Sequence, residues 1–307
     1  MPNAVPKRRL ANCPSSRGGR AVAVLSHGDD KSAKLPIVDR PEFERRFAEE
    51  NYRDDAPLSA RQSIWAYAGP MTPPLDYVDF TGAKTIVDVG CGNGVWLERV
   101  RRHPEVSHAT VVGLDLSAGM LDALRSRIGP TPLLQADAVR LPMASTSVDV
   151  AMALWMLYHV SDLPAALREL HRVLREGGTL LAVTVGASHL HELVALLNDA
   201  LCCCVGPVEP ADWWPESHFT AEDAPADLGA VFGEVEAHVV HRPVRIPTAT
   251  PILDYLTSLR DSIEIAIGRE LPWTEVLRAA EDRIGEVLAV EDHFVVTGVV
   301  ATFVCHA

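Results

Sequence analysis

The chain has 307 residues, 48% of them hydrophobic, so it can bury a sizeable core in one large domain or two small ones. Its net charge of −13 is unevenly placed: residues 1–34 carry seven Lys and Arg against two Asp and Glu, which leaves 21 positive against 39 negative side chains elsewhere, a net −18. This acidic body disfavours a nucleic acid as the main partner, because binding to a phosphate backbone depends on clustered Lys and Arg.

Apolar runs and cysteines narrow the class of protein further. The basic N-terminal stretch contains only the short apolar run AVAVL, which does not make a signal peptide. The longest apolar runs, near 151–160 and 295–304, are well short of the ~20 residues of a membrane span. The six cysteines form no CxxC pair and no zinc-site spacing with histidine. We expect a soluble, cytoplasmic protein with free thiols, no metal site and no membrane partner.

The N-terminal part predicts two regions ahead of the main domain. Residues 1–36 are rich in Pro, Gly, Ser and Arg without periodicity, which predicts a disordered basic tail. Residues 37–80 are expected to form an N-terminal helical cap. The helical pattern at 41–68 has spaced apolar anchors at Phe43, Phe47, Ile64 and Trp65. The remaining residues, 81–307, are expected to form the main domain.

Short apolar runs then alternate with helical segments. The expected strands are 85–90, 109–116, 132–137, 148–156 and 179–185, and the expected helices are 94–103, 117–128 and 163–176. Ser117 is expected to cap the second of these helices, and Gly177-Gly178 to close the third. Such alternation with short turns predicts a parallel sheet covered by helices on both faces, which the continuously apolar strands also indicate.

Beyond residue 186 the pattern becomes less regular. Helices are expected at 188–204, within 219–232, at 250–264 and at 272–289, and strands at 235–246 and 293–307. The last two strands would extend the same sheet. The predicted fold class is therefore α/β, a Rossmann-like seven-stranded, mostly parallel sheet with helices on both faces. The helices near 188–204 and 250–289 are expected as insertions over its ligand edge.

A glycine-rich turn follows the first expected strand, in IVDVGCGNGVWL (86–97). Gly90, Gly92 and Gly94 alternate there, and the usual reason for such a turn is a ligand lying against the backbone. The carboxyl end of a strand is also where α/β sheets bind ligands. A dinucleotide-binding turn needs G-x-G-x-x-G, but Val95 stands at the third glycine position, which disfavours an NAD-dependent oxidoreductase.

Two acids end the next two expected strands. Asp115, in GLDLS, follows the glycines by about twenty residues, where a carboxylate can accept hydrogen bonds from both ribose hydroxyls of a nucleoside. Asp137, in LLQADAVRLP, is placed to accept a hydrogen bond from an adenine amino group, with the Ala138 amide beside it. Either acid alone could be a helix cap or a loop residue. Together, at successive strand ends, they indicate a single nucleoside ligand.

The glycine turn, Asp115 and Asp137 are followed along the chain by the segment SVDVAMALWMLYHVSDLPAALRELHRVLREGGTLLAVT. This segment is expected to run through strand, loop, helix and strand. With them, residues 85–185 resemble the class I S-adenosylmethionine-dependent methyltransferases, in the branch typified by the ubiquinone/menaquinone biosynthesis C-methyltransferases. The resemblance covers roughly a third of the chain. It implies S-adenosylmethionine as cofactor, held by Asp88, Gly90, Cys91, Gly92, Gly94, Asp115, Leu116, Met120, Asp137, Ala138 and Leu154.

The resemblance also implies which part of the cofactor each group of these residues would contact. The glycine turn would surround the methionine part, and Asp88 would shape the turn and reach the amino group. Leu154 would border the sulfonium end, and Leu116 and Met120 would lie near the adenine. Met120 has core packing as an alternative, because it stands at helical spacing with apolar neighbours.

The chemistry demands no fixed catalytic residue. Methyl transfer needs alignment and exclusion of water, and needs a general base only when the acceptor arrives protonated and weakly nucleophilic. His159 follows the fourth strand and is the candidate base; its alternative is a residue that bonds the backbone at a helix entry. The sequence leaves two roles open for a further set of aromatic residues, which could line the acceptor pocket or pack in the core: Tyr52, Trp65, Tyr67, Trp155, Tyr158, Trp213 and Trp214. His189 and His191 have an exposed helix face as their alternative.

The predicted function is enzymatic: S-adenosylmethionine-dependent methyl transfer to a small organic acceptor, in biosynthesis of specialised metabolites or cofactors. The basic residues 1–34 motivate an alternative in which RNA or protein is the acceptor. The absence of an evident base motivates another, a non-catalytic scaffold protein that binds the nucleoside. The sequence leaves open the acceptor, the methylated atom (O, N or C) and the oligomeric state.

Overall fold

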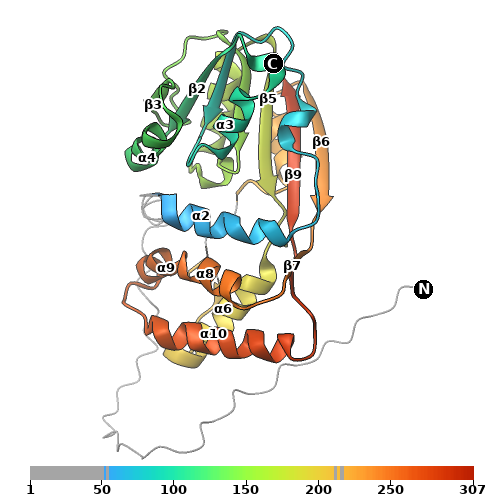
Figure 1. The fold of residues 1–307 in the computed structure, drawn as a ribbon. Coiled ribbons are helices and arrows are strands. Elements are labelled where there is room, and N and C mark those ends of the chain that lie inside the picture. Colours follow the sequence, from blue (N-terminus) through green and yellow to red (C-terminus); the bar gives the residue numbers. More distant parts are fainter. Residues whose placement is uncertain (1–51, 53–54, 211–212, 215–217) are drawn as a thin grey trace, which may run out of the picture. The chain divides into compact units, whose positions relative to one another are not determined.

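A computed structural model describes residues 52, 55–210, 213–214 and 218–307 of the chain (Figure 1). These residues belong to one compact unit of the chain, 37–307. The expected basic tail at 1–36 and the expected helical anchors Phe43 and Phe47 lie outside the described residues. Within the described part, every helix is too short or too polar to cross a membrane.

A seven-stranded sheet in the order β3-β2-β1-β4-β5-β9-β6 forms the centre of the main domain. Its strands are β1 (Thr85–Val89), β2 (Thr110–Asp115), β3 (Leu133–Gln135), β4 (Val148–Leu154), β5 (Leu174–Val185), β6 (Glu234–His241) and β9 (Val299–His306). The first five strands pair in parallel, whereas β9 runs antiparallel to both β5 and β6. The expectation of a seven-stranded, mostly parallel sheet is confirmed.

Each face of this sheet packs against its own helices, because successive side chains of a strand point to opposite faces. Ile86 of β1 belongs to one apolar core together with Leu97, whereas Val87 belongs to another core together with Leu167. The helices and turns along this part are α3 (Val95–Arg101), η3 (Pro104–Val106), α4 (Ala118–Ile128), η4 (Leu157–His159), α5 (Leu163–Val173) and α7 (Ala224–Gly229).

A third apolar core lies within a separate group of helices, here called the helical cap, which is not the N-terminal cap expected at residues 37–80. It comprises α6 (His191–Val205), α8 (Thr250–Thr257), α9 (Arg260–Ile267), α10 (Trp273–Leu288) and the hairpin of β7 (Val244–Ile246) and β8 (Phe294–Val296). Between the cap and the sheet runs α2 (Asp55–Ser63), followed by η1 (Ile64–Tyr67) and η2 (Pro74–Tyr77) (Figure 1). Figure 1 thus shows α2 as the layer that separates the two parts.

Several expected elements are divided in the structure. The strand expected at 235–246 is split into β6 and β7, and the strand expected at 293–307 into β8 and β9; in each case the two pieces belong to different sheets. Pro243 lies at the first break, where its missing N–H cannot join a ladder. The helix expected at 250–264 is broken into α8 and α9. Gly177 and Gly178 do not close α5, which ends at Val173. They lie inside β5, where they exchange hydrogen bonds with Ala307, the last residue of the chain.

Candidate functional site

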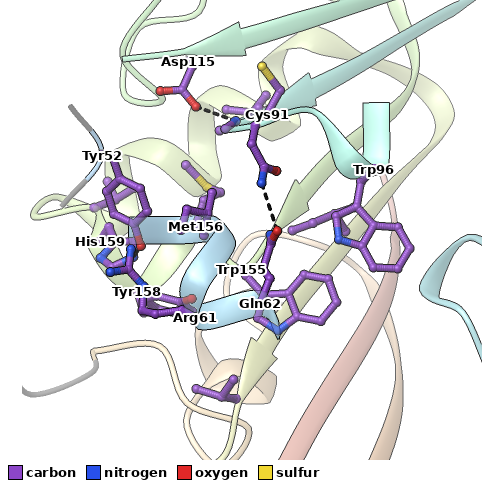
Figure 2. Close-up of a pocket in the computed structure, with 18 of the residues that line it drawn as sticks. Tyr52, Arg61, Gln62, Cys91, Trp96, Asp115, Trp155, Met156, Tyr158 and His159 are labelled. Atoms are coloured by element: carbon purple, nitrogen blue, oxygen red, sulfur yellow. Dashed lines mark hydrogen bonds between the residues drawn. The ribbon is translucent and has the colours of Figure 1, made fainter. Parts of the chain in front are cut away.

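A cavity of about 2270 Å³ lies where the carboxyl ends of the parallel strands meet α2 (Figure 2). Residues at or just after four strand ends line it, namely Gly90, Asp115, Leu154 and Val185. Residues of α2 and of the helical cap close the other side, among them Leu58, Arg61 and Tyr255. This is the edge at which α/β sheets bind ligands, so the topology alone marks it as the candidate site.

The glycine turn is a left-handed backbone segment anchored to the neighbouring strand. Gly90, Gly92 and Gly94 have φ values of 71°, 50° and 74°, which favour glycine over any residue with a Cβ. The amides of Gly90 and Cys91 both donate to the Leu114 carbonyl, at 2.7 and 2.9 Å. The turn is therefore fixed at the junction between β1 and β2, with its backbone facing the cavity.

The space around these glycines corrects the expectation that all three make room for a ligand. A Cβ on Gly90 would lie 2.7 Å from Met156 Cβ, and one on Gly94 would lie 2.3 Å from Leu124 Cδ1. On Gly92 the nearest heavy atom would be 3.4 Å away, an ordinary contact. Two glycines thus make room for protein side chains, whereas a Cβ on Gly92 would make only an ordinary contact with Leu58.

Asp115 joins the end of β2 to the glycine turn. Its Oδ2 accepts from the Gly92 amide at 2.8 Å (Figure 2). Its Oδ1 accepts from the Ser117 amide, also at 2.8 Å. Burial raises the pKa of this carboxyl, and amide hydrogen bonds from Ser117, Gly92 and Leu116 oppose the rise. Each carboxylate oxygen keeps a lone pair for a further donor, as two sugar hydroxyls would require. Ser117 caps α4 as expected, accepting from the Met120 amide at 3.2 Å.

Asp88 is a buried carboxyl that lines the same cavity. It is 2% exposed, and its Oδ2 has no hydrogen-bond partner among the described residues. Burial, and then the neighbouring Asp115, raise its pKa to about 8. A buried acid without a partner is costly unless a cation or donor completes it. The ammonium group of S-adenosylmethionine would supply one, so this residue fits the expected cofactor.

Asp88→Asn is expected to flatten the pH dependence of stability of the ligand-free protein. The folded state holds this proton more tightly than the unfolded state, whose pKa is near the ordinary 3.8. The carboxyl's stabilising contribution is therefore complete below that value and is lost as the pH rises to about 8, at up to about 1.4 kcal/mol per pH unit. Urea denaturation across this range checks it, with exposed Asp122→Asn as the control. Parallel curves for Asp88→Asn and the wild type would contradict it.

The part of the cavity expected to hold the adenine is more exposed to solvent than the part around Asp88 and Asp115. Asp137 is exposed, lines the cavity and uses Oδ1 to accept from the Val139 amide at 3.1 Å. Beside it, Ala138 is buried, and Leu116 leaves 56% of its surface exposed at the cavity. An exposed leucine next to acceptor groups provides an apolar face for a flat ring. These residues suit a base that stacks on one side and donates hydrogen bonds at its edge.

Nine of the eleven residues predicted to bind the cofactor line this one cavity: Asp88, Gly90, Cys91, Gly92, Asp115, Leu116, Asp137, Ala138 and Leu154. Gly94 and Met120 do not. Met120 is fully buried in α4, which corrects its expected place near the adenine in favour of core packing. Gly94 begins α3 and packs against the core side chain of Leu124.

His159, the candidate base, lines the cavity and bonds a side chain instead of the backbone. Its Nε2 lies 2.7 Å from the hydroxyl of Tyr52 (Figure 2). Burial, and then the charge of Arg61, lower the pKa of His159 to about 3. The imidazole is therefore neutral at neutral pH and a weak proton acceptor. The geometry favours a binding role for His159 over general-base catalysis.

Sequence reasoning missed the contribution of α2. Gln62 accepts from the Asn93 side chain at 2.9 Å, which ties α2 to the glycine turn (Figure 2). At the other end of this segment, the Tyr52 carbonyl accepts from the Ser117 hydroxyl at 2.7 Å. The aromatic residues Tyr52 and Trp65 were candidates for pocket walls, but no motif marked Arg61 or Gln62. Their role arises from tertiary packing.

Aromatic side chains form the opposite wall. Trp96 and Trp155 stack with centroids 5.3 Å apart, and Arg99 lies over Trp96 at 4.5 Å. Trp155 has a φ of 55°, an uncommon backbone state for a bulky residue and one often found at functional sites. Other candidates that line the cavity are Tyr52, Trp65, Tyr158, His189 and Trp214, whereas Tyr67, His191 and Trp213 do not.

His189 does not lie on an exposed helix face, which was the alternative to a place in the pocket. Its Nδ1 accepts from the Val299 amide at 3.0 Å, and its ring stacks on Trp65 at 5.3 Å. Burial lowers its pKa to about 4, so the ring is neutral. Because an amide can only donate, the single proton of this ring resides on Nε2. His191 is exposed, as its alternative expected.

Comparison with known proteins gives matches to the same part of the chain. Residues 87–182 match the family model described as "Methyltransferase domain". The chain is 38% identical over 114 residues to a malonyl-[acyl-carrier protein] O-methyltransferase of Serratia marcescens, a match that covers 36% of this chain. The matched stretch spans only 42% of that relative's length.

Solved structures show the likeness of fold. A methyltransferase candidate from Bacillus halodurans C-125 has 17% identity and a TM-score of 0.50, over 76% of this chain and 96% of that one. Phosphoethanolamine N-methyltransferase 2 of Haemonchus contortus, in complex with S-adenosyl-L-methionine, has 16% identity and a TM-score of 0.50. That match covers 86% of this chain and 59% of that one.

The family match and the geometry fall on the same elements. The matched segment begins in β1 and ends in β5, so it contains the glycine turn and the acids that end β2 and follow β3. It leaves out α2 and the whole helical cap. Residues 87–182 are thus similar to a methyltransferase domain, and S-adenosylmethionine is the methyl donor that the glycine turn and the strand-end acids fit.

Proposed function

We propose that the whole chain transfers a methyl group from S-adenosylmethionine to a small organic acceptor that enters the cavity between α2 and the strand ends. The observation that carries this proposal is one cavity with two chemically distinct sets of lining residues. Asp88, Gly92 and Asp115 line it at the strand ends, and aromatic and polar residues of other elements line it as well. Such a cavity suits a nucleoside donor and a second molecule together.

The residues on the donor side match the groups of S-adenosylmethionine. Asp88 would pair with its ammonium, Asp115 would accept from its ribose hydroxyls, and Asp137 would accept from its adenine. When bound, S-adenosylmethionine supplies a methyl group activated by a positively charged sulfur. The protein's part is then to orient the acceptor and to exclude water, which proximity can convert into several kcal/mol of barrier reduction.

The acceptor side lies largely beyond the family match. Tyr52, Arg61 and Tyr255 line it, and all three fall outside 87–182. Membership in the ubiquinone/menaquinone branch therefore stays a prediction, since branches differ in this part. The weakly basic His159 supports an acceptor that needs no strong base.

A second candidate acceptor is an acyl group carried by a protein. The relative from Serratia marcescens is named for its action on malonyl-[acyl-carrier protein], and its 38% identity over 114 residues favours this candidate. The cavity is compatible with an acyl chain, because apolar and aromatic residues such as Met71, Trp65 and Leu259 are among its lining residues. RNA as the acceptor is disfavoured by the net −18 of residues 35–307.

Isothermal titration of the purified chain tests the proposal. We expect saturable one-to-one binding of S-adenosylmethionine and S-adenosylhomocysteine, and no binding of NAD. Methyl-labelled donor is then incubated with small acceptors or with a malonyl-loaded carrier protein, and transfer to one of them is expected. Binding without transfer to any acceptor would favour the scaffold alternative, and absence of binding would overturn the proposal. Truncation of residues 1–34 should leave transfer to a small acceptor intact.

A further inference from the structure

His189 is a partly buried histidine that lines the cavity and whose ring is held in two directions. Its Nδ1 accepts from the amide of Val299, the first residue of β9, at 3.0 Å. One face of the ring stacks on Trp65, with the ring centroids 5.3 Å apart and the planes 24° apart. A backbone hydrogen bond and a neighbouring ring therefore fix the orientation of this imidazole.

The loop that carries His189 is itself anchored to the chain at the start of β9. The Gly186 amide donates to the Val299 carbonyl at 3.2 Å, and the Leu190 amide donates to the Thr297 carbonyl at 2.8 Å. Together with the bond from Val299 to the imidazole, these contacts join the loop to β9 at three points. A side chain held this rigidly loses little entropy when it binds a ligand.

The other ring nitrogen of His189 is a hydrogen-bond donor that no described residue uses. Because Nδ1 accepts from an amide, the single proton of the neutral ring lies on Nε2. Burial lowers the pKa of His189 to about 4, so the ring is neutral at pH 7. Nε2 has no hydrogen-bond partner within the described part of the chain, and it is not among the atoms there that are sealed from solvent. A ligand in the cavity can therefore reach this donor.

Charged groups of both signs surround this loop. The carboxylates of Glu192 and Glu222 accept from backbone amides beside it and within it, at 2.8 and 3.0 Å. The guanidinium carbon of Arg242 lies 5.8 Å from the ring centre of Trp65. An anion therefore finds no excess of positive charge here, and a cationic amine would present only N–H donors to the N–H of His189. An uncharged oxygen suits this donor best.

We propose that His189 donates its Nε2–H to an uncharged oxygen of the methyl acceptor, such as a carbonyl oxygen, and thereby determines acceptor specificity; the inference rests on the proposed function. The bond holds the acceptor at the end of β5, the strand that pairs with β4. Leu154, at the end of β4, is expected to border the sulfonium of the donor. Donation by Nε2 leaves the bond from Val299 to Nδ1 intact, because the two bonds use different nitrogens.

Three phenols with one carbon skeleton test this: para-hydroxybenzylacetone, para-butylphenol, which lacks the ketone oxygen, and the primary amine that corresponds to the ketone. Each is titrated calorimetrically into the full chain saturated with S-adenosylhomocysteine. We expect His189→Asn to weaken binding of the ketone by about threefold to tenfold, the factor for one neutral hydrogen bond. Binding of para-butylphenol and of the amine should not weaken, since neither accepts from Nε2. A ketone that fails to bind the wild type, or that loses no more affinity than para-butylphenol, would overturn the proposal.

Two substitutions at this position separate the donor from the structural bond. The side-chain oxygen of His189→Asn can still accept from the Val299 amide, but asparagine is too short to place a donor where Nε2 lies. His189→Phe loses both bonds and keeps only a ring against Trp65. With a merely structural role, Asn would retain the affinity for the ketone and only Phe would lose it. His191→Asn, at an exposed histidine that does not line the cavity, is the matched control and should change nothing.

Nitrogen NMR of the wild-type chain with isotopically labelled histidine tests the same bond without relying on a variant's stability. We expect an unprotonated Nδ1 and a protonated Nε2 for His189, whose signals are those missing from the spectra of its variants. Added ketone should shift the Nε2 signal and para-butylphenol should not. A proton on Nδ1, or an Nε2 signal that the ketone leaves unmoved, would contradict the proposal. Binding of S-adenosylhomocysteine, measured first in every sample, separates failure of the proposed function from failure of this inference.

Discussion

Asp115→Ala is expected to weaken the binding of S-adenosylhomocysteine by at least about 100-fold, since hydrogen bonds to a charged group contribute about 1.5–3 kcal/mol each. The carboxylate has two expected roles that alanine cannot fill. It would accept from both ribose hydroxyls, and it also accepts from the amides of Gly92 and Ser117. Loss of the side chain would therefore remove the expected ligand contacts and free the turn that is expected to surround the methionine part. Calorimetric titration measures the change.

The matched control for this prediction is Asp122→Ala. Asp122 is an exposed carboxylate on α4 that pairs with Arg125 at 2.7 Å, outside the cavity. Its removal should leave the affinity unchanged, because an exposed ion pair contributes at most about 1 kcal/mol to stability. A thermal melt of Asp115→Ala shows whether the variant is folded. A folded Asp115→Ala that binds within a few-fold of the wild type would disprove the assigned role.

The donor side of the cavity could be predicted from the sequence because its determinants are local. A glycine turn after β1 and acids near the ends of β2 and β3 can each be found in a short stretch of letters. The topology of parallel sheets then brings these stretches to one edge. Asp88, Gly92, Asp115 and Asp137 accordingly line one cavity, as their positions in the chain predicted.

The acceptor side could not be predicted in the same way. Arg61 and Gln62 belong to a helix ahead of the sheet, and their place in the cavity depends on how α2 packs between the sheet and the cap. Tertiary packing of this kind leaves no periodic signal. Met120 shows a related limit, since a helix with neighbouring apolar positions has more than one candidate buried face. The structure turns the Met120 side chain into the core.

The sequence pattern also did not predict where a strand ends and the chain continues into a different sheet. The apolar residues of 235–246 alternate well enough for one strand, and only the packing of β7 against β8 shows that the chain changes sheets after Pro243. Gly177 and Gly178 resemble a helix end locally. Their pairing with Ala307 is a contact between residues far apart in sequence, and it decides their place in β5.

Gly94→Ala is expected to lower the free energy of unfolding by about 2–5 kcal/mol. The backbone of Gly94 has a φ of 74°, and a left-handed residue with a Cβ costs about 1–2 kcal/mol. The new methyl group would also lie 2.3 Å from Leu124 Cδ1, so the core between α3 and α4 must shift. Overpacking of a core costs a further 1–3 kcal/mol, roughly. Urea denaturation of the ligand-free protein measures the sum.

Gly268→Ala separates the two contributions. Gly268 has nearly the same left-handed backbone, with a φ of 73° and a ψ of 22°, but a Cβ there would have no heavy atom within 4 Å. This variant should therefore lose only the backbone part, about 1–2 kcal/mol. Equal losses in the two variants would show that packing against Leu124 is unimportant. A larger loss in Gly94→Ala would show that this glycine is required by the protein's own core and not by the ligand, so a glycine in such a motif need not mark a cofactor contact.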